Sequence, residues 1–317
     1  VHKGMVYFGE KLEEISGGKL KVQIYPSQQL GTERQCLELL QIGSLDMTKV
    51  SAGVLENFSP SIKVFGIPYI FRDKKHTFRV LDGPIGDELL AGTEKYWLKG
   101  LGYYDSGSRS FYTIDKPIDK PNDLEGLKIR VMESQTAIDM VKSFGGSPTP
   151  ISWGELYTSL DRGTIDALEW VGPGMDIRMG FHKIAPFYYA GWHEPASDMQ
   201  FLINKRQFDK LPKAYQTVLK TAMKAVSADM YAENFADSAK AWEQMKADYP
   251  GIKVKTFPKE VLQKMKVETD NVLGGYAAQD AFFKKVLDSQ REFMAKARAW
   301  TTISEFYYIE TSAAVQQ

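Results

Sequence analysis

The chain has 317 residues, which exceeds one ordinary hydrophobic core and fits two lobes of about 150 residues each. The chain has 40 Lys and Arg residues and 40 Asp and Glu residues, so its formal net charge is zero. It therefore has no overall electrostatic field that would attract nucleic acid or an anionic membrane, and we expect no nucleic-acid partner. The single cysteine, Cys36, excludes an internal disulfide framework and a zinc site built on thiolates.

Short apolar segments alternate with amphipathic helices, which predicts an α/β fold with largely parallel sheets. A helical pattern covers residues 1–16, and its position at residue one suggests that a leader and a first strand have been removed. Strands are predicted at 20–25, 46–50 and 98–104, and a helix at 32–42.

A second α/β run begins near Phe111. Its predicted strands are 127–131, 163–168 and 199–203, and its helices are 136–144 and 153–160. One helical pattern then continues from 213 to 249, long enough at about 1.5 Å per residue to brace both lobes. We divide the chain into lobe I, residues 1–108 and 196–238, and lobe II, residues 109–195 and 239–317.

The sequence contains no nucleophile elbow, phosphate loop, dinucleotide fingerprint or metalloprotease helix. It also lacks a run of 18 apolar residues that could cross a bilayer. Together with the two-lobe pattern, these absences favour a binding protein that needs no cofactor. The alternative of another class is a two-lobed enzyme that clamps a carboxylate substrate.

Several segments carry a family resemblance when they are taken in order. They are FGEKLEEISGGKLKVQIYPSQQLG at 8–31, IPYIFRDKKHTFRVLDGPIG at 67–86, DLEGLKIRVMES at 123–134, GGSPTPISWGELYTSLDRGTIDALEWVGP at 145–173 and GFHKIAPFYYAGWHEP at 180–195. This series resembles the DctP family, the solute receptors of tripartite ATP-independent periplasmic (TRAP) transporters, and within it the branch that binds 2-oxo acids and other monocarboxylates.

The resemblance implies a periplasmic, two-lobed fold of the periplasmic-binding-protein type. Hinge strands and one long helix would join the lobes, which would close on a small organic acid in the cleft between them. The expected partners are that acid and the membrane components of a TRAP transporter.

Arg130 is the predicted carboxylate anchor, because the arginine of the matching LKIRV strand grips the ligand in the family. A guanidinium offers two parallel donors that match a carboxylate, and it stays charged when buried. Arg130 interrupts an apolar strand near its C-terminal end, where ligand sites of α/β proteins lie. The alternative is a structural ion pair.

Arg109 stands where the related 2-oxo acid receptors have a glutamine that helps to hold a cation. The rest of their cation site matches Glu169, Trp170 and Glu194 of this sequence. Because a guanidinium and a metal ion repel each other, we expect Arg109 to replace the cation and to pair with Glu169 or with the substrate, and we predict no metal. The alternative for Arg109 is a solvated cation in a loop.

Aromatic residues are predicted to form the walls of the pocket. Trp170 and Trp192 are the main candidates, with core packing as the alternative for each, and His193 lies between Trp192 and Glu194. Tyr69 is a weaker candidate contact in the loop after Pro68.

The predicted ligand is a 2-oxo, 2-hydroxy or aromatic monocarboxylate. A C4-dicarboxylate or an acidic sugar held by both arginines is the alternative.

Overall fold

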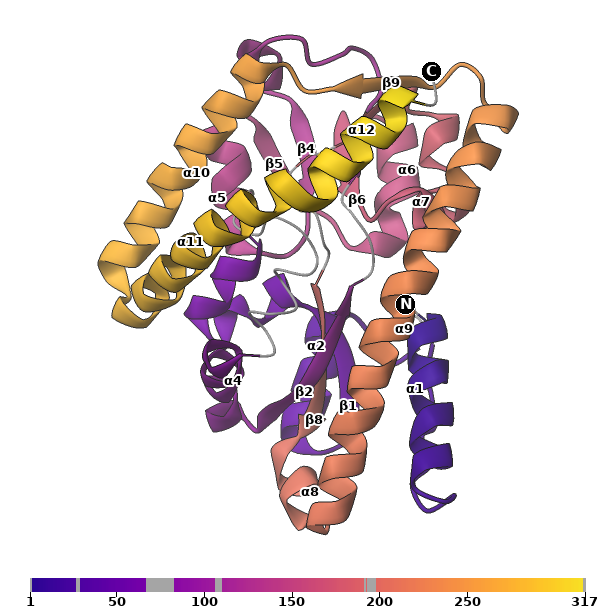
Figure 1. The fold of residues 1–317 in the computed structure, drawn as a ribbon, viewed down its shortest axis with the longest axis vertical. Helices are drawn as coiled ribbons and strands as arrows, with labels where there is room; N and C mark the ends of the chain where they lie inside the picture. Colours follow the sequence, from indigo (N-terminus) through magenta and orange to yellow (C-terminus); the bar gives the residue numbers. More distant parts are fainter. Residues whose placement is uncertain are drawn as a thin grey trace.

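The computed structural model describes residues 2–26, 29–66, 83–105, 110–190, 192 and 198–315. Two separate sheets form the centres of two lobes, which lie one above the other in Figure 1, with long helices along their sides. The expected two-lobed α/β architecture is therefore confirmed.

The sheet of lobe I has the order β1-β8-β2. Its strands are β1 (Met47–Ser51), β8 (Asp198–Asn204) and β2 (Leu98–Asp105), and both pairings are antiparallel. The prediction of a largely parallel sheet is wrong for this lobe. The predicted strand at 20–25 is also wrong: the segment has no strand pairing among the described residues, and its Leu20 and Val22 pack against the core instead.

Helices cover both faces of this sheet because the side chains of the central strand β8 alternate between two cores. Leu202 belongs to one cluster and Phe201 and Ile203 belong to the other. The helices of this part of the chain are α1 (His2–Ile15), α2 (Glu33–Ile42), α4 (Pro84–Ala91) and α8 (Lys205–Lys210), with the short 3₁₀ helices η1 (Ala52–Asn57), η2 (Pro60–Gly66) and η3 (Glu94–Tyr96).

The sheet of lobe II has six strands in the order β5-β4-β6-β3-β7-β9. They are β3 (Ser110–Thr113), β4 (Lys128–Val131), β5 (Ser147–Pro150), β6 (Ala167–Trp170), β7 (Phe187–Ala190) and β9 (Lys253–Thr256). The pairs β4·β5, β4·β6 and β7·β9 are parallel, and β3 is antiparallel to both of its neighbours. This sheet is mixed.

Short helices complete lobe II. They are α5 (Gln135–Ser143), α6 (Leu156–Asp161) and α7 (Pro173–Met179), with the 3₁₀ helices η4 (Pro121–Leu124), η5 (Trp153–Glu155) and η6 (Phe181–Lys183). Again two cores flank the sheet, since Phe111 and Tyr112 of β3 point into different clusters.

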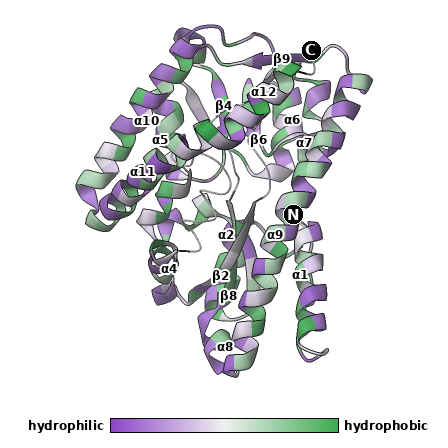
Figure 2. Ribbon diagram, viewed as in Figure 1, coloured by the Kyte–Doolittle hydropathy of each residue, from purple (hydrophilic) through white to green (hydrophobic). Residues whose placement is uncertain are grey.

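The predicted long helix is α9 (Lys213–Asp248), and it contacts β2 of lobe I as well as α7 of lobe II. Gly102 allows the close approach to β2, because a Cβ atom there would lie 2.6 Å from Met223 Cγ. The predicted brace across both lobes is confirmed. Figure 2 shows hydrophilic and hydrophobic residues alternating along α9, α10 and α11, as expected of helices that bury one face.

The C-terminal helices are α10 (Lys259–Gln279), α11 (Ala281–Thr301) and α12 (Tyr307–Val315), with the π-helical turn η7 (Thr302–Phe306) between the last two. Phe283, Val286 and Leu287 of α11 pack into a core cluster with residues of lobe I. The sequence-based division assigned this helix to lobe II.

No helix within the described ranges is long and apolar enough to cross a membrane.

Candidate functional site: the cleft between the lobes

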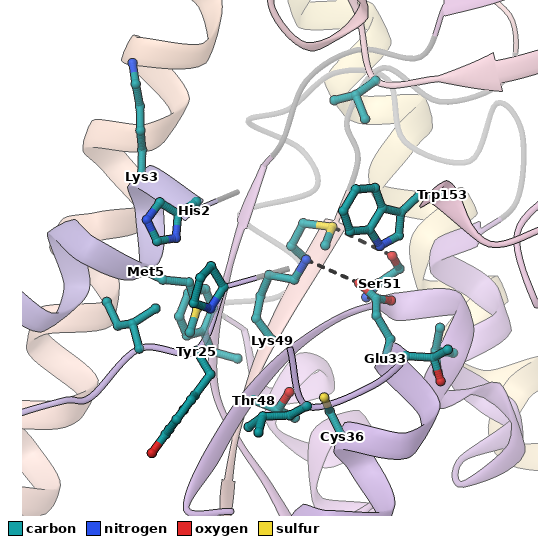
Figure 3. A pocket seen from close by; sticks show the side chains of 18 of the residues that line it. His2, Lys3, Met5, Tyr25, Glu33, Cys36, Thr48, Lys49, Ser51 and Trp153 are labelled. Atoms are coloured by element: carbon teal, nitrogen blue, oxygen red, sulfur yellow. Dashed lines mark hydrogen bonds and ion pairs between the residues drawn. The ribbon is translucent and has the colours of Figure 1, made fainter. Parts of the chain in front are cut away.

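A cleft of about 850 Å³ lies between the lobes, a volume in the range of ligand-binding pockets. Lobe I and lobe II each supply one wall, and α9 contributes Met230 and Asn234. The main residues from lobe I are Met5, Phe8, Glu33, Met47, Lys49, Ser51 and Met199, and those from lobe II are Arg130, Met132, Ile151, Trp153, Trp170 and Met175. Figure 3 shows part of the lining, mostly on the lobe I side.

Arg130 reaches the cleft because strand alternation separates it from its apolar neighbours. Ile129 and Val131 belong to a core cluster, whereas Arg130 is among the lining residues. The Arg130 side chain is 6% exposed. Its Nε donates to the carbonyl oxygen of Ile151 at 3.2 Å, and Nη1 donates to Glu169 Oε1 at 2.8 Å. These bonds fix the orientation of the guanidinium plane.

Glu169 projects from β6, the parallel neighbour of β4, so the two charged side chains start from adjacent strands. Its side chain is as buried as that of Arg130, at 6% exposed. We expected Arg109 to pair with Glu169 or with the substrate, and Arg109 lies outside the described residues. Glu169 forms a buried ion pair with Arg130, which is the contact that the structural alternative for Arg130 describes. A buried pair of this kind limits the net charge of the site.

Trp170 follows Glu169 and forms part of the wall. The Arg130 guanidinium carbon lies 5.3 Å from the centroid of the Trp170 ring, within cation–π range. The indole N–H is buried and has no hydrogen-bond partner among the described residues. An unpaired buried donor of this kind costs free energy.

Asp176 is a buried acid that we did not predict from the sequence, and it stabilises the segment that follows Trp170. Asp176 is fully buried, and its carboxylate accepts hydrogen bonds from Ser110 Oγ at 2.6 Å, the Tyr112 hydroxyl at 2.7 Å and the Gly172 N–H at 3.0 Å. Burial raises the pKa of Asp176 above its ordinary value. The network ties α7 to β3 and so fixes the segment that follows Trp170.

Trp192 does not line this cleft. It is 4% exposed in a core cluster of lobe II, where its ring stacks on Phe111 with centroids 4.2 Å apart. The alternative of core packing describes this environment. Four other predicted ligand contacts lie outside the described residues, namely Tyr69, Arg109, His193 and Glu194.

The lobe I wall carries polar residues that we did not select from the sequence. Along β1 the exposure alternates, and Met47, Lys49 and Ser51 are the partly exposed positions that face the cleft. Lys49 Nζ lies 3.3 Å from Glu33 Oε1, and the Ser51 N–H donates to Glu33 Oε2 at 3.0 Å (Figure 3). The alternation in MTKVS was the available signal, but it does not tell which face meets the cleft.

A two-lobed α/β fold with a ligand-sized interlobe cleft and a buried arginine in its wall is typical of a solute-binding protein. The chain belongs to the DctP family, bacterial extracellular solute-binding protein, family 7, whose model matches residues 1–280. The family predicted from the sequence motifs is thus confirmed.

Three known proteins illustrate the similarity. The uncharacterized protein YiiZ of Salmonella typhimurium is 39% identical over 227 residues, which cover 71% of this chain and 68% of that protein. A TRAP periplasmic solute binding protein from Bradyrhizobium sp. BTAi1, solved with galacturonate, is 33% identical with a TM-score of 0.83 and covers 92% of this chain and 94% of its own. One from Colwellia psychrerythraea, solved with calcium and pyruvate, is 31% identical with a TM-score of 0.89 and covers 98% and 94%.

The calcium in the Colwellia protein raises the question of a cation in this cleft. Within the described part of the chain, no group of three His, Cys, Asp or Glu side chains is placed to hold a metal ion. Glu169 pairs with Arg130, whose positive charge would repel a cation at that carboxylate. Two of the four residues that match the cation site of the related receptors, Arg109 and Glu194, lie outside the described ranges, so the expectation that no metal binds stays a prediction.

Proposed function

We propose that this chain is a periplasmic receptor, not an enzyme, which binds a small organic carboxylate in the interlobe cleft and delivers it to the membrane components of a TRAP transporter. The observation that carries the proposal is the buried Arg130 in the cleft wall. A guanidinium that has already lost its water binds a carboxylate strongly, because the low local dielectric strengthens charge-assisted hydrogen bonds.

The division of roles follows from the contacts. Arg130 would anchor the carboxylate, Glu169 would hold Arg130 in place, and Trp170 would supply an aromatic wall. For Arg109 we keep the role of a built-in replacement for the cation. The galacturonate and pyruvate bound by the two related structures support monocarboxylates that range from short 2-oxo acids to acidic sugars.

Thermal shift against a panel of acids tests the proposal. Pyruvate, lactate, benzoate, succinate and D-galacturonate form the panel, each with and without calcium, and the corresponding amides or alcohols are the neutral controls. A ligand at 100 times its Kd adds about 2.7 kcal/mol of stability. If no acid raises the melting temperature, or if neutral analogues raise it equally, the receptor assignment fails.

Arg130 variants then test the anchor. Arg130→Met should lower the affinity for every acid at least 100-fold, since charge-assisted bonds are lost, and Arg130→Lys should recover only part of the affinity. Because Arg130→Met removes the ion pair with Glu169, the double variant Arg130→Met/Glu169→Gln separates stability from binding. The control is Lys128→Met, an exposed lysine on the same strand. Calorimetric titration that finds intact binding in Arg130→Met would exclude Arg130 as the anchor.

A further inference from the structure

The wall of lobe I places a charged pair opposite the proposed carboxylate anchor. Lys49 comes from β1 and Glu33 from the first turn of α2, whose start is fixed by a capping box between Thr32 and Gln35. Both charged side chains line the cleft that Arg130 lines from lobe II. The pair is therefore held by regular structure on both sides, which gives it a defined geometry.

The pair is only partly open to water. The Lys49 side chain is 11% exposed and that of Glu33 is 25% exposed, values well below those of the many surface lysine pairs of this chain. Lys49 Nζ lies 3.3 Å from one Glu33 oxygen, and the other oxygen accepts the Ser51 N–H at 3.0 Å. Figure 3 shows the Lys49 ammonium and the Ser51 side chain on the lobe I wall, together with Trp153, which comes from lobe II.

The chemistry of this group differs from that of an anion site. An ammonium has three donors, and a carboxylate has about four acceptor positions, so each member of the pair keeps further capacity beyond the bonds described. Its formal charge is zero. A ligand hydroxyl, which both donates and accepts, matches such a pair, whereas a second ligand carboxylate would meet the negative charge of Glu33.

Apolar side chains surround the polar group. Met47 and Met199 lie on the same wall, from β1 and from its partner strand β8. Thioether side chains adapt to irregular shapes and contact C–H groups well. A carbon chain that carries hydroxyls presents both kinds of surface, so this wall suits it better than it suits a short 2-oxo acid.

We infer that Lys49, Glu33 and Ser51 form a second subsite, which binds a hydroxyl group of the ligand whose carboxylate Arg130 holds. This inference rests on the proposed function and narrows the ligand to a hydroxylated monocarboxylate. It also gives the ligand contacts on both lobes. A ligand that contacts both walls favours the closed arrangement over the open one by the free energy of the added contacts.

The test uses acids that differ in hydroxyl groups, length and charge, and the six-carbon acids among them are matched in length. Gluconate and D-galacturonate carry hydroxyls, hexanoate has six carbons without them, pyruvate is short, and succinate has a second carboxylate. The wild-type chain should bind a hydroxylated acid at least tenfold more tightly than hexanoate. In Lys49→Met this preference should fall at least tenfold, because hydrogen bonds to a charged group are lost, while hexanoate and pyruvate change less than about twofold.

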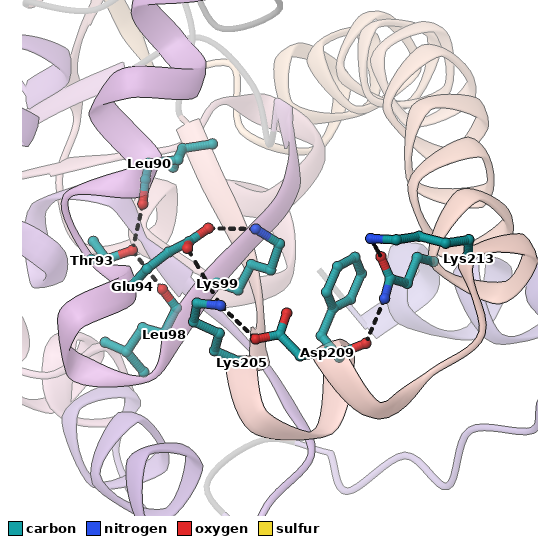
Figure 4. Close-up of polar contacts among 10 residues, drawn as sticks. Leu90, Thr93, Glu94, Leu98, Lys99, Lys205, Asp209 and Lys213 are labelled. Carbon is teal, nitrogen blue, oxygen red and sulfur yellow. Dashed lines mark hydrogen bonds and ion pairs between the residues drawn. The ribbon is translucent and has the colours of Figure 1, made fainter.

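Two further variants keep the result interpretable. Glu33→Gln removes the negative charge, so the affinity for succinate should rise relative to that for gluconate. Lys99→Met is the matched control: Lys99 forms a partly buried ion pair with Glu94, which also approaches Lys205 (Figure 4), away from the cleft lining. It should lose some stability and leave the preference unchanged.

The outcomes separate the two proposals. If the wild-type chain binds none of these acids, the proposed receptor function and the proposed subsite are both refuted. If it binds acids but Lys49→Met weakens pyruvate, hexanoate and gluconate equally, the receptor function stands and the hydroxyl subsite is refuted. Tighter binding of succinate than of gluconate by the wild-type chain refutes the subsite as well.

Discussion

At the scale of single residues, the ion pair between Arg130 and Glu169 matters most. Both side chains have lost nearly all contact with water, so the ion pair compensates part of the cost of burying the two charges. A carboxylate ligand that approaches Arg130 must share it with Glu169. The ion pair with Glu169 therefore stabilises the buried Arg130 and also weakens the attraction of Arg130 for an anionic ligand.

This competition predicts opposite effects of Glu169→Gln on stability and on binding. The free energy of unfolding without ligand should fall by about 3–5 kcal/mol, because a buried guanidinium loses a charged partner at 2.8 Å. The affinity for a carboxylate should rise, because the ligand then supplies that charge. Denaturant unfolding and calorimetric titration measure the two quantities.

Asp119→Asn provides the control for this variant. Asp119 pairs with Lys255 at 3.0 Å in a largely exposed position, and its loss should cost no more than about 1 kcal/mol. A Glu169→Gln variant that keeps its stability, or that loses carboxylate affinity, would contradict the competition.

At the scale of elements, a contact between η1 and the start of α5 connects the lobes. Glu56 is 3% exposed, and its carboxylate accepts hydrogen bonds from Ser134 Oγ at 2.7 Å and from the Thr136 N–H at 3.1 Å. A side chain of lobe I thus satisfies a backbone donor at the N-terminus of a helix in lobe II. Burial raises the pKa of Glu56 above its ordinary value.

The raised pKa gives the wild-type chain a predictable pH dependence relative to Glu56→Gln. Between the unfolded and the folded pKa, the native state binds more protons, so this contribution to stability is full at low pH and declines as pH rises through that window. The stability advantage of wild type over Glu56→Gln should narrow as pH increases from the ordinary glutamate value. Denaturant unfolding at a series of pH values measures the difference.

Glu38→Gln, at an exposed position in α2, should show no such trend. A difference between wild type and Glu56→Gln that widens with rising pH would mean that the hydrogen bonds from Ser134 and Thr136 outweigh burial in setting the protonation of Glu56.

At the scale of the whole molecule, the two walls of the cleft depend on how closely the lobes dock. Gly53 of lobe I meets lobe II so tightly that a Cβ atom there would lie 2.8 Å from Met132 Sδ and 3.0 Å from Ser134 Cβ. Only glycine fits at this junction without displacement of its neighbours. The junction lies beside the cleft, since Met132 is one of its lining residues.

Gly53→Val should therefore separate the walls and weaken carboxylate binding about tenfold or more, through lost contacts that require both lobes. Isothermal titration with the best acid of the panel measures the loss. Gly274→Ala is the control, because no atom lies within 4 Å of a Cβ there and the position is helical. It should leave binding unchanged, and equal affinities for Gly53→Val and wild type would show that the junction does not set the cleft.

Several features could be predicted because they depend on local sequence. The helical pattern of residues 213–249 predicted the bounds of α9 to within one residue, since helix periodicity is a property of near neighbours. The alternation in LKIRV likewise predicted a strand with Arg130 opposite its apolar neighbours. The family motifs added the two-lobed arrangement, which local patterns do not specify.

Other features were decided by tertiary structure alone. Strand pairing made the lobe I sheet antiparallel, and the pairing of Arg130 with Glu169 joins residues 39 positions apart. Trp192 packs in the core, and Lys49 faces the cleft, although the residues next to them in the sequence do not indicate either environment. Periodicity tells which residues share a face, but the partner of that face is chosen by long-range packing and by the need of each buried charge for a counter-charge.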